Sequence, residues 1–341
     1  MKVRLLGKTP EELKQIALEA GLPAFAGKQI AQWLYVKRVR SIQEMTNLSK
    51  AGREALDAIA QVGLQEPIDV QVSADGTKKY LFPVSGDSAN AVEAVMIPEG
   101  NRKTLCVSSQ AGCKMGCKFC MTGRQGFHGN LQAADILSQY FAIEEAGELT
   151  NTVFMGMGEP LDNWEEVKRV ITVLTADWGL AWSSKRITLS TIGVIPNLRR
   201  FLDECKCHLA VSLHNPFPEE RLEMMPVQKA WTAQEVIRLI KSYDFTGQRR
   251  VSFEYTVFEG WNNTPRHAQA LQRLLRGLEC RVNLIRFHKI PDFPYGPASA
   301  RAMEEFRDML CAEGLTATIR ASRGEDIFAA CGLLAGKHNN G

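Results

Sequence analysis

Three cysteines lie close together in the run Cys113-Lys114-Met115-Gly116-Cys117-Lys118-Phe119-Cys120, with C-x3-C-x2-C spacing. Thiolates are ligands of zinc and of iron–sulfur clusters. A structural zinc site needs four protein ligands that leave no open position, and no fourth Cys or His follows Cys120 at ordinary pair spacing. Three thiolates on a four-iron cluster leave one iron open, which can bind the amine and carboxylate of a substrate. The spacing therefore favours an iron–sulfur cluster with one open iron.

Polar residues also follow other short apolar runs. Met155-Gly156-Met157-Gly158-Glu159-Pro160 is a glycine-rich turn with a carboxylate that can meet the ammonium group of a ligand. Ser190 and the run Ser212-Leu213-His214 end two further predicted strands, where hydroxyls can hold a ribose or a carboxylate. Each feature by itself is equally typical of an ordinary strand end.

The elements that position these residues alternate along the chain. After residue 100, short apolar runs alternate with amphipathic segments, which favours parallel strands joined by crossover helices. Six such units are too few for a closed eight-fold barrel, so we expect an α/β fold with a partial (β/α)6 barrel and its chemistry at the carboxyl ends of the strands. Asp162 with Glu165, and Thr232 with Glu235, predict capping boxes at two helices. Strands are predicted near 104–109, 152–157, 187–190, 208–213, 251–256, 281–287 and 316–320, and helices near 133–146, 163–178, 195–204, 232–243, 265–277 and 298–313.

The chain divides into four predicted parts. Residues 1–65 have helical spacing and predict a small N-terminal helical domain. Residues 66–98 have short alternating runs, which predict a small β linker region whose sheet leads into the core. Residues 99–332 form the predicted core, and 333–341 form a tail.

The composition excludes several classes of protein. The 341 residues are 45% hydrophobic and 23% charged, unlike a disordered or collagen-like chain. No stretch approaches the roughly 20 apolar residues of a membrane span, and the first residues lack the apolar core of a signal peptide. We therefore expect no membrane association and a cytoplasmic location. Thiols stay reduced there, so nine cysteines indicate ligands, reactive groups or buried small hydrophobes rather than bridges.

The positive charge is concentrated in the N-terminal part of the chain. Residues 1–65 carry ten Lys and Arg against six Asp and Glu, a balance of +4, whereas the remainder carries −1. Lys37-Arg38-Val39-Arg40 directly follows Gln32-Trp33-Leu34-Tyr35. Cations beside aromatics suit a surface that grips phosphates and stacks on bases. The alternative is a solvated helix end, with Trp33 and Leu34 in a core.

Together these motifs resemble the RlmN/Cfr family of radical S-adenosylmethionine (SAM) RNA methyltransferases, from about residue 25 to about residue 336. The cysteine loop resembles the signature of the whole radical SAM superfamily. The family-specific likeness is carried by Phe25-Ala26-Gly27-Lys28-Gln29-Ile30, Trp33-Leu34-Tyr35, Thr104-Leu105-Cys106-Val107-Ser108-Ser109-Gln110, Gly156-Met157-Gly158-Glu159-Pro160, Leu189-Ser190-Thr191, Ser212-Leu213-His214 and Ala329-Ala330-Cys331-Gly332. The expected fold is then a partial (β/α)6 radical SAM barrel with a small N-terminal helical domain.

The resemblance implies a role for each matching residue. Cys331 would be the methyl carrier, present as an S-methylcysteine intermediate, Cys106 the resolving thiol and Glu93 the proton acceptor. Where the RlmN pattern has Asn after the sixth strand, this chain has His288, which could replace that contact with SAM. The residues implied for the [4Fe–4S] cluster are Cys113, Cys117 and Cys120, and those implied for SAM are Gly158, Glu159, Ser190, Ser212, Leu213 and His214.

The reaction implied by the resemblance is methylation of adenine C2 in RNA, with two SAM molecules per turnover. Cleavage of one SAM gives a 5′-deoxyadenosyl radical, which abstracts hydrogen from a methyl group that Cys331 has taken from the other. A thiolate suits both methyl transfer and later release, in which Cys106 attacks the thioether and a disulfide bond forms. Thr104, Cys106 and Ser108 alternate with Leu105 and Val107 along the strand. Cys106 therefore lies on a polar face that should point into the barrel. Cys205, Cys207, Cys280 and Cys311 are interpreted as buried small hydrophobes.

The implied partners are RNA and an electron donor such as flavodoxin, and we expect the chain to be a monomer. The family suggests adenosine 2503 of 23S rRNA and adenosine 37 of certain tRNAs as substrates. An adenine in folded RNA must be unstacked, and Lys37, Arg38 and Arg40 are the candidates for gripping the backbone.

Two alternatives stay open at this point. Cfr-type methylation at adenine C8 is the close rival; Pro160 favours the RlmN type, whose pattern is GEP rather than GEA. The second is a non-catalytic RNA-binding protein whose cysteine loop holds zinc or an inert cluster.

Overall fold

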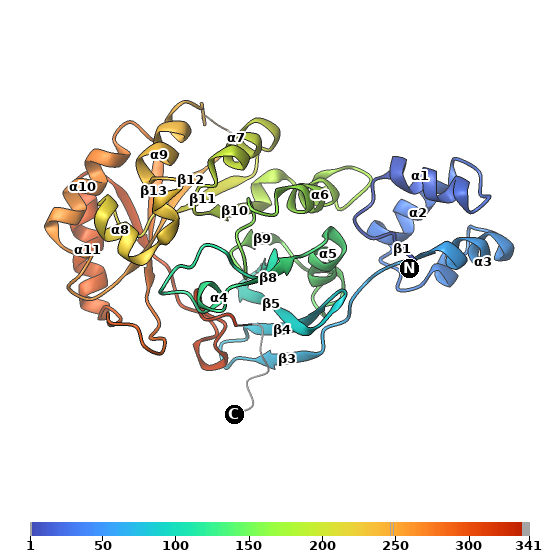
Figure 1. Cartoon of the computed structure of the whole chain (residues 1–341), viewed down its shortest axis with the longest axis horizontal. Helices are drawn as coiled ribbons and strands as arrows, with labels where there is room; N and C mark the ends of the chain where they lie inside the picture. The colour runs from blue at the N-terminus through green and yellow to red at the C-terminus, as the bar shows by residue number, and fades with distance from the viewer. Residues whose placement is uncertain (1, 246, 248, 336–341) are drawn as a thin grey trace.

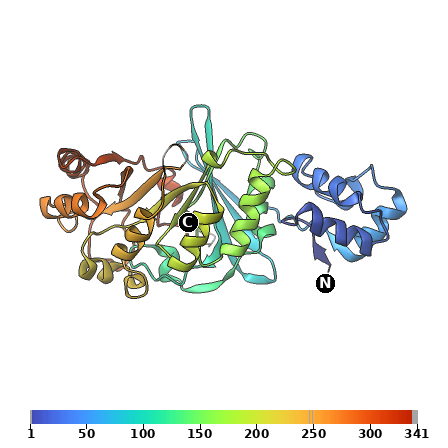
Figure 2. The same ribbon diagram turned by 90° about the horizontal axis from the view of Figure 1, so that it is seen from above.

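The structure is a computed structural model that describes residues 2–245, 247 and 249–335. A small helical domain at the N-terminus lies beside a larger α/β core (Figure 1). Seen from above, this domain occupies one end of an elongated molecule (Figure 2). The part of the predicted tail from residue 336 onward lies outside the described residues.

One ten-stranded sheet forms the centre of the core. Its strand order is β14-β13-β12-β11-β10-β9-β6-β5-β4-β3. The seven strands from β6 to β14 in this order pair in parallel. They are β6 (Arg102–Cys106), β9 (Asn151–Phe154), β10 (Ile187–Thr191), β11 (His208–Ser212), β12 (Val251–Val257), β13 (Cys280–Arg286) and β14 (Thr316–Ile319).

Crossover helices join the parallel strands, as the alternating pattern predicted. Their apolar faces are buried in a continuous core, which is where most of the stabilisation of such helices arises. The capping box of Thr232 and Glu235 is confirmed, whereas that of Asp162 is wrong, because Asn163 is the N-cap residue and Asp162 pairs with Lys114. The helices are α5 (Ala133–Phe141), α6 (Trp164–Thr175), α7 (Ile195–Glu204), α9 (Ala233–Lys241), α10 (Pro265–Leu275) and α11 (Ala300–Ala312).

Three antiparallel strands extend this sheet at the β6 edge. They are β3 (Asp69–Val72), β4 (Lys78–Val84) and β5 (Asp87–Glu99), and β5 pairs with β6. The small sheet expected at 66–98 is therefore continuous with the core sheet. A tight turn between Glu99 and Arg102 joins β5 to β6, so the antiparallel strands lead directly into the parallel ones.

The N-terminal domain contains short helices and a two-stranded parallel sheet. Buried charged and aromatic contacts attach it to the core: Arg4 pairs with Asp135 at 2.7 Å, and the Tyr35 ring packs on Trp178 at 5.4 Å. Its elements are β1 (Val3–Arg4), α1 (Pro10–Glu19), α2 (Ala26–Ala31), a π-helical turn η1 (Gln32–Val36), a 3-10 turn η2 (Ile42–Glu44), α3 (Lys50–Ile59) and β2 (Ala60–Gln61).

Short elements that the sequence pattern did not predict surround the cysteine loop. The hairpin of β7 (Gln110–Gly112) and β8 (Phe127–Asn130) encloses the loop, and α4 (Met121–Arg124) begins directly after Cys120. Helix α8 (Pro218–Met224) and the 3-10 turn η4 (Pro226–Lys229) follow β11. Short helices lack the apolar repeat over several turns on which a prediction depends. Among the described residues, no helix combines the length and apolar character needed to cross a membrane.

Candidate active site

The candidate residues gather at the carboxyl ends of the parallel strands, as expected for this class of barrel. Cys106 is the last residue of β6, Ser190 lies on β10, and Ser212 ends β11. Gly158 and Glu159 follow β9. The Gly158 backbone has φ +98, and a Cβ there would lie 2.5 Å from the Gln110 side chain. Glycine is therefore required where the β9 turn passes β7.

The three loop cysteines are close enough for their thiols to interact electrostatically. Burial raises the pKa of Cys113 to about 12, and burial likewise raises the pKa values of Cys117 and Cys120. Among the described residues, no three His, Cys, Asp or Glu side chains already form a closed metal site. The donor set nevertheless fits an iron–sulfur cluster, because a cationic metal core offsets the cost of neighbouring buried thiolates.

Helix α8 holds the cysteine loop against β11. The Lys118 N–H donates to the Met224 carbonyl at 3.0 Å, at the end of α8. Arg221 of the same helix is 1% exposed and donates to the carbonyls of Ser212 and Leu213 at 3.1 and 3.0 Å. Its charge interacts with the Cys117 thiol. This helix therefore links the loop to the strand end that carries the Ser212 motif.

The Glu159 carboxylate is 3% exposed and is already bonded within the protein. It accepts hydrogen bonds from the Thr191 hydroxyl at 2.7 Å and from the backbone N–H groups of Ile192 and Leu161 at 2.9 and 3.0 Å. Burial raises the pKa of Glu159 to about 7, although these hydrogen bonds oppose that rise. Glu159 thus ties the β9 turn to the end of β10, next to Ser190.

His214 is a neutral, buried histidine. Its Nδ1 accepts the Thr256 N–H at 2.9 Å, so the ring proton is assigned to Nε2. Desolvation lowers the pKa of His214 to about 3. The backbone is left-handed at φ +56, and the ring lies edge-on to Phe119 of the cysteine loop at 4.9 Å. Ser190 and Ser212 are half-buried, and Leu213 is buried beside them.

Cys106 and Cys331 are brought together from opposite ends of the core. Desolvation raises the pKa of Cys106 to about 12, and the neighbouring Cys331 adds to this. Desolvation also raises the pKa of Cys331, whereas Arg320 lowers it. The Cys331 residue as a whole is nevertheless exposed. All nine cysteines are free thiols.

Arg320 lies at the end of β14 and interacts with both of these thiols. Its guanidinium donates to the buried Glu254 carboxylate at 3.2 Å and to the Met155 sulfur at 3.5 Å. Glu254 also accepts from Asn283 at 2.8 Å. A cation is therefore fixed beside the two thiols by side chains from the barrel interior.

Glu93 forms a second polar centre beneath the C-terminal segment. Its carboxylate pairs with Lys79 at 3.0 Å, and both side chains are almost completely buried. The other carboxylate oxygen accepts the Ala335 N–H at 2.6 Å. The Thr122 hydroxyl donates to the Leu334 carbonyl at 2.8 Å, so α4 holds the same segment, red in Figure 1. The described end of the chain thus covers Glu93 and carries Cys331 to the cysteine loop.

His288 lies farther along this side of the barrel. Its Nε2 is 3.1 Å from the Ser322 hydroxyl, and its Nδ1 is 4.0 Å from the Glu325 carboxylate. Desolvation lowers its pKa. Both ring nitrogens therefore already have partners on the segment that leads to Cys331.

The three predicted RNA-binding residues of the N-terminal domain, Lys37, Arg38 and Arg40, differ in their surroundings. Lys37 is exposed and lies 3.7 Å above the Trp33 ring. Arg40 is exposed and pairs with Glu66. Arg38 is half-buried and packs on Phe141 of the core at 5.8 Å. Only Lys37 and Arg40 therefore present their charge to solvent, and Arg38 belongs to the junction between domain and core.

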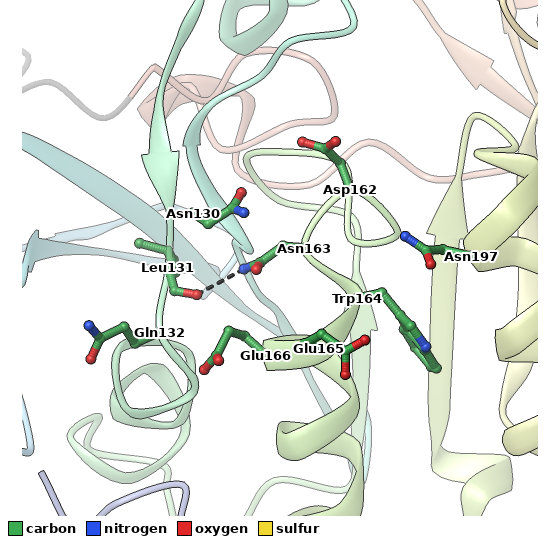
Figure 3. Close-up of a pocket in the computed structure, with 9 residues that line it drawn as sticks. All are labelled: Asn130, Leu131, Gln132, Asp162, Asn163, Trp164, Glu165, Glu166 and Asn197. Carbon is green, nitrogen blue, oxygen red and sulfur yellow. Dashed lines mark hydrogen bonds between the residues drawn. The ribbon is translucent and has the colours of Figure 1, made fainter.

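A cavity of about 360 Å³ lies beside the cysteine loop rather than at it (Figure 3). It opens between the starts of α5 and α6, where the Asn163 amide donates to the Leu131 carbonyl at 2.8 Å. Three carboxylates in its lining are unsuited to a phosphate backbone. The lining residues are Asn130, Leu131, Gln132, Asp162, Asn163, Trp164, Glu165, Glu166 and Asn197.

Sequence reasoning missed three cations near the site: Lys79 and Arg221, which are buried, and Arg320, which is partly exposed. Leu81 pairs with Glu93, and Lys79 lies two residues from Leu81, so Lys79 and Glu93 share a face of the hairpin. The available signal in the sequence was a charged residue inside an alternating strand. Arg320 directly follows a predicted strand end. Nothing local identifies Arg221, because its partners lie in other segments. Of the four remaining cysteines expected to be buried, Cys311 is exposed, so that expectation was wrong.

Comparisons with known proteins agree with this arrangement. Residues 107–269 match the model of the radical SAM superfamily, and residues 3–62 match that of the ribosomal RNA large subunit methyltransferase N-terminal domain. The chain is similar to a crystal structure of a radical SAM methyltransferase from Sphaerobacter thermophilus, with a TM-score of 0.92 and 37% identity over 98% of this chain and 100% of that one.

Curated relatives match over nearly their full length. A "probable dual-specificity RNA methyltransferase RlmN" of Porphyromonas gingivalis is 58% identical, over 98% of this chain and 94% of the relative. The protein of the same name in Parabacteroides distasonis is 57% identical, over 99% and 98%. The "dual-specificity RNA methyltransferase RlmN" of Syntrophus aciditrophicus is 40% identical, over 98% and 97%. With its matching fold and strand-end residues, the chain belongs to the RlmN family of the radical SAM superfamily.

Proposed function

We propose that this chain is a radical SAM methyltransferase that forms 2-methyladenosine in RNA through an S-methylcysteine on Cys331. The observation that carries the proposal is the meeting of two thiols, Cys331 and Cys106, beside the three-cysteine loop. A reaction in which one thiol delivers a methyl group and a second releases it needs this arrangement. An inert metal-binding module does not.

Two cofactor sites support the proposal. Cys113, Cys117 and Cys120 hold a [4Fe–4S] cluster, and the turn at Gly158 and Glu159, with Ser190, Ser212, Leu213 and His214, holds SAM; His288 takes the position of the family's asparagine. When bound, these groups supply the electron and the 5′-deoxyadenosyl radical that activate a methyl group, and two SAM molecules are used per turnover. The Glu159 carboxylate is hydrogen-bonded within the protein and shapes the turn. The turn therefore presents backbone groups to SAM rather than a free carboxylate.

Cys331 takes a methyl group on its sulfur and carries it to the adenine. Methyl transfer requires the thiolate, which burial disfavours. Arg320 counters that cost with a fixed positive charge, and Glu254 holds the guanidinium in place. The partial exposure of Cys331 leaves a side from which the base can approach.

Glu93 and Cys106 complete the reaction. Glu93 accepts the proton lost from C2, after the C-terminal segment that bonds to it at Ala335 has moved aside. The Cys106 thiolate then attacks the Cys331 sulfur: the carbon–sulfur bond breaks, its electron pair stays with the methylene carbon, that carbon takes up a proton, and methylated RNA leaves while a Cys106–Cys331 disulfide remains. Lys79 holds the Glu93 carboxylate in position before the proton transfer.

The proposed substrates are those that the family resemblance implies, adenosine 2503 of 23S rRNA and adenosine 37 of certain tRNAs; the dual-specificity name of the relatives is consistent with more than one RNA substrate. The N-terminal domain grips the RNA backbone through its exposed cations. We further propose a monomer in the cytoplasm that takes electrons from a donor such as flavodoxin; nine free thiols are consistent with a reducing compartment.

The test combines protein and RNA chemistry. Reconstituted protein is incubated anaerobically with SAM, reductant and RNA; peptides are analysed by mass spectrometry, and digested RNA is analysed for methyladenosine isomers. We expect a methyl group on Cys331 and 2-methyladenosine in the RNA, and Cys331→Ala should retain iron yet form neither. An 8-methyladenosine product would overturn the position of methylation, and methylation by Cys331→Ala would overturn the carrier.

A further inference from the structure

Arg221 is the most deeply buried arginine described, and its charge has no carboxylate partner. The side chain is 1% exposed. Its donors go to two backbone carbonyls and to the Gln228 side-chain oxygen, the last at 2.6 Å. Within residues 2–245, 247 and 249–335, no Asp or Glu forms an ion pair with it. By contrast, the partly buried Arg4, Arg169 and Arg320 each pair with an acid.

An unpaired charge in the interior is unfavourable, because neutral hydrogen-bond acceptors do not replace an opposite charge. Desolvation lowers the pKa of Arg221 to about 10, so the guanidinium is still protonated at neutral pH. The ionisable group that attracts it is the thiol of Cys117. The compensating negative charge is therefore expected from the cysteine loop.

The fold aims this cation at the loop from a fixed position. Arg221 is anchored at the end of β11 through Ser212 and Leu213. Helix α8, which carries it, is bonded to the loop through the Lys118 N–H and the Met224 carbonyl. Arg221 thus cannot turn to solvent without breaking its hydrogen bonds to Ser212, Leu213 and Gln228.

We propose that Arg221 is a positioning residue that supplies the counter-charge for the cluster, stabilising the extra negative charge that the cluster gains when it is reduced. This inference rests on the proposed cluster at the three cysteines. A four-iron cluster with three thiolate ligands is anionic, and reduction adds one electron from an external low-potential donor, which is dithionite in the test below. A fixed cation beside Cys117 favours the reduced form and raises its potential.

Two variants remove one unit of positive charge from this site by different routes. Arg221→Gln removes the guanidinium. Gln228→Glu keeps it but places a carboxylate on the atom that Arg221 already contacts, with almost unchanged shape. The matched control is Arg249→Gln, because Arg249 interacts with Cys205 and Cys207 at the opposite ends of the strands.

The experiment is an anaerobic redox titration of reconstituted protein, followed by electron paramagnetic resonance of the reduced cluster, with iron content measured in parallel. We expect both variants to lower the ratio of reduced to oxidised cluster at a fixed potential about tenfold, which is about 59 mV for one electron. Arg249→Gln should titrate as the wild type does. The rise in melting temperature on cluster loading should also be smaller in both variants, and cluster-free Gln228→Glu should melt above the wild type, because its arginine is then paired.

The outcomes separate this inference from the proposed function. Wild-type potentials in Gln228→Glu with full iron content would overturn the role of Arg221, and this holds even if Arg221→Gln does not fold. A wild-type protein that cannot be loaded with iron would overturn the proposed function and the inference with it. A loaded wild type with unshifted variants would overturn the inference alone.

Discussion

The carboxyl end of the barrel and the N-terminal domain use charge in opposite ways. At the barrel end, Glu93 and Lys79 form a buried pair, and the buried Glu254 carboxylate holds the partly exposed Arg320. In the N-terminal domain, Lys37 and Arg40 extend into solvent. Buried charges interact strongly and depend on an accurate geometry, whereas exposed charges are screened by salt. The first arrangement suits catalysis and the second suits RNA recognition. Substitutions at the barrel end should therefore change rate and stability, whereas those in the N-terminal domain should change RNA affinity and its salt dependence.

The largest effect is expected at the resolving thiol. Cys106→Ala should form the bond between Cys331 and RNA but should not release the product, so free methylated RNA falls by at least about a thousandfold. Denaturing gels of labelled RNA would show a protein–RNA adduct. Cys207→Ala, a buried cysteine at the other end of β11, is the control and should turn over normally. Free product from Cys106→Ala without an adduct would remove Cys106 from the mechanism.

A second large effect concerns the buried ion pair beneath the C-terminal segment. Glu93→Gln leaves Lys79 buried without its partner, so we expect a loss of about 3–5 kcal/mol in the free energy of unfolding and about 10²–10⁴-fold in rate. The double variant Lys79→Met with Glu93→Gln should recover much of the stability but none of the rate. Urea denaturation and single-turnover assays measure the two effects. Recovery of the rate in the double variant would show that Glu93 is purely structural.

A smaller effect concerns the pH dependence of stability. Burial raises the pKa of Glu159 to about 7 from an ordinary 4.5, so the folded chain binds this proton more tightly than the unfolded chain does. Its stabilising contribution is present below pH 4.5 and is lost as the pH rises through 7. The free energy of unfolding of the wild type relative to Glu159→Gln should fall by up to about 3 kcal/mol over that range, at about 1.4 kcal/mol per pKa unit.

Urea denaturation of cluster-free protein at several pH values measures this difference. His208 and His214, whose lowered pKa values act in the opposite direction, titrate in both proteins and cancel. A difference that does not change with pH would mean that Glu159 is ionised throughout.

The smallest effect is expected in the N-terminal domain. Lys37→Ala with Arg40→Ala should weaken RNA binding several-fold and reduce the salt slope of the binding constant by up to about 0.7–0.9 per lost phosphate contact, while single-turnover rates at saturating RNA stay unchanged. Arg38→Ala is the contrast, because Arg38 packs on Phe141 and should affect stability more than the salt slope. A salt slope equal to that of the wild type would exclude Lys37 and Arg40 from the RNA contact.

The sequence predicted those features that local patterns encode. The barrel strands followed from apolar runs, and the Thr232 capping box from two side chains three residues apart. The three-cysteine loop was identified by spacing alone. What could not be predicted depends on contacts between distant segments, such as the ion pair of Arg4 with Asp135 and the hydrogen bond from Ala335 to Glu93. Asp162 satisfied a helix-start pattern, but its carboxylate bonds to Lys114, because tertiary contacts outweigh a local preference.

The roles of Cys106 and Cys331 required a different source. Each cysteine alone has the sequence environment of a buried small hydrophobe. Family resemblance distinguished them from Cys205 and Cys207, and the structure brings the two thiols together. The pattern of cations beside aromatics indicated Arg38 together with Lys37 and Arg40, and Arg38 packs on Phe141 of the core.

The central claim is that three thiolates hold a four-iron cluster with one open iron. It is tested most directly by iron and sulfide analysis of anaerobically purified protein, with electron paramagnetic resonance of the reduced form before and after adding SAM. We predict about four iron and four sulfide per chain and a spectrum that changes when SAM is added. Cys117→Ala should lose the iron and sulfide and, with them, the spectrum. Zinc without iron, or a spectrum unchanged by SAM, would contradict it.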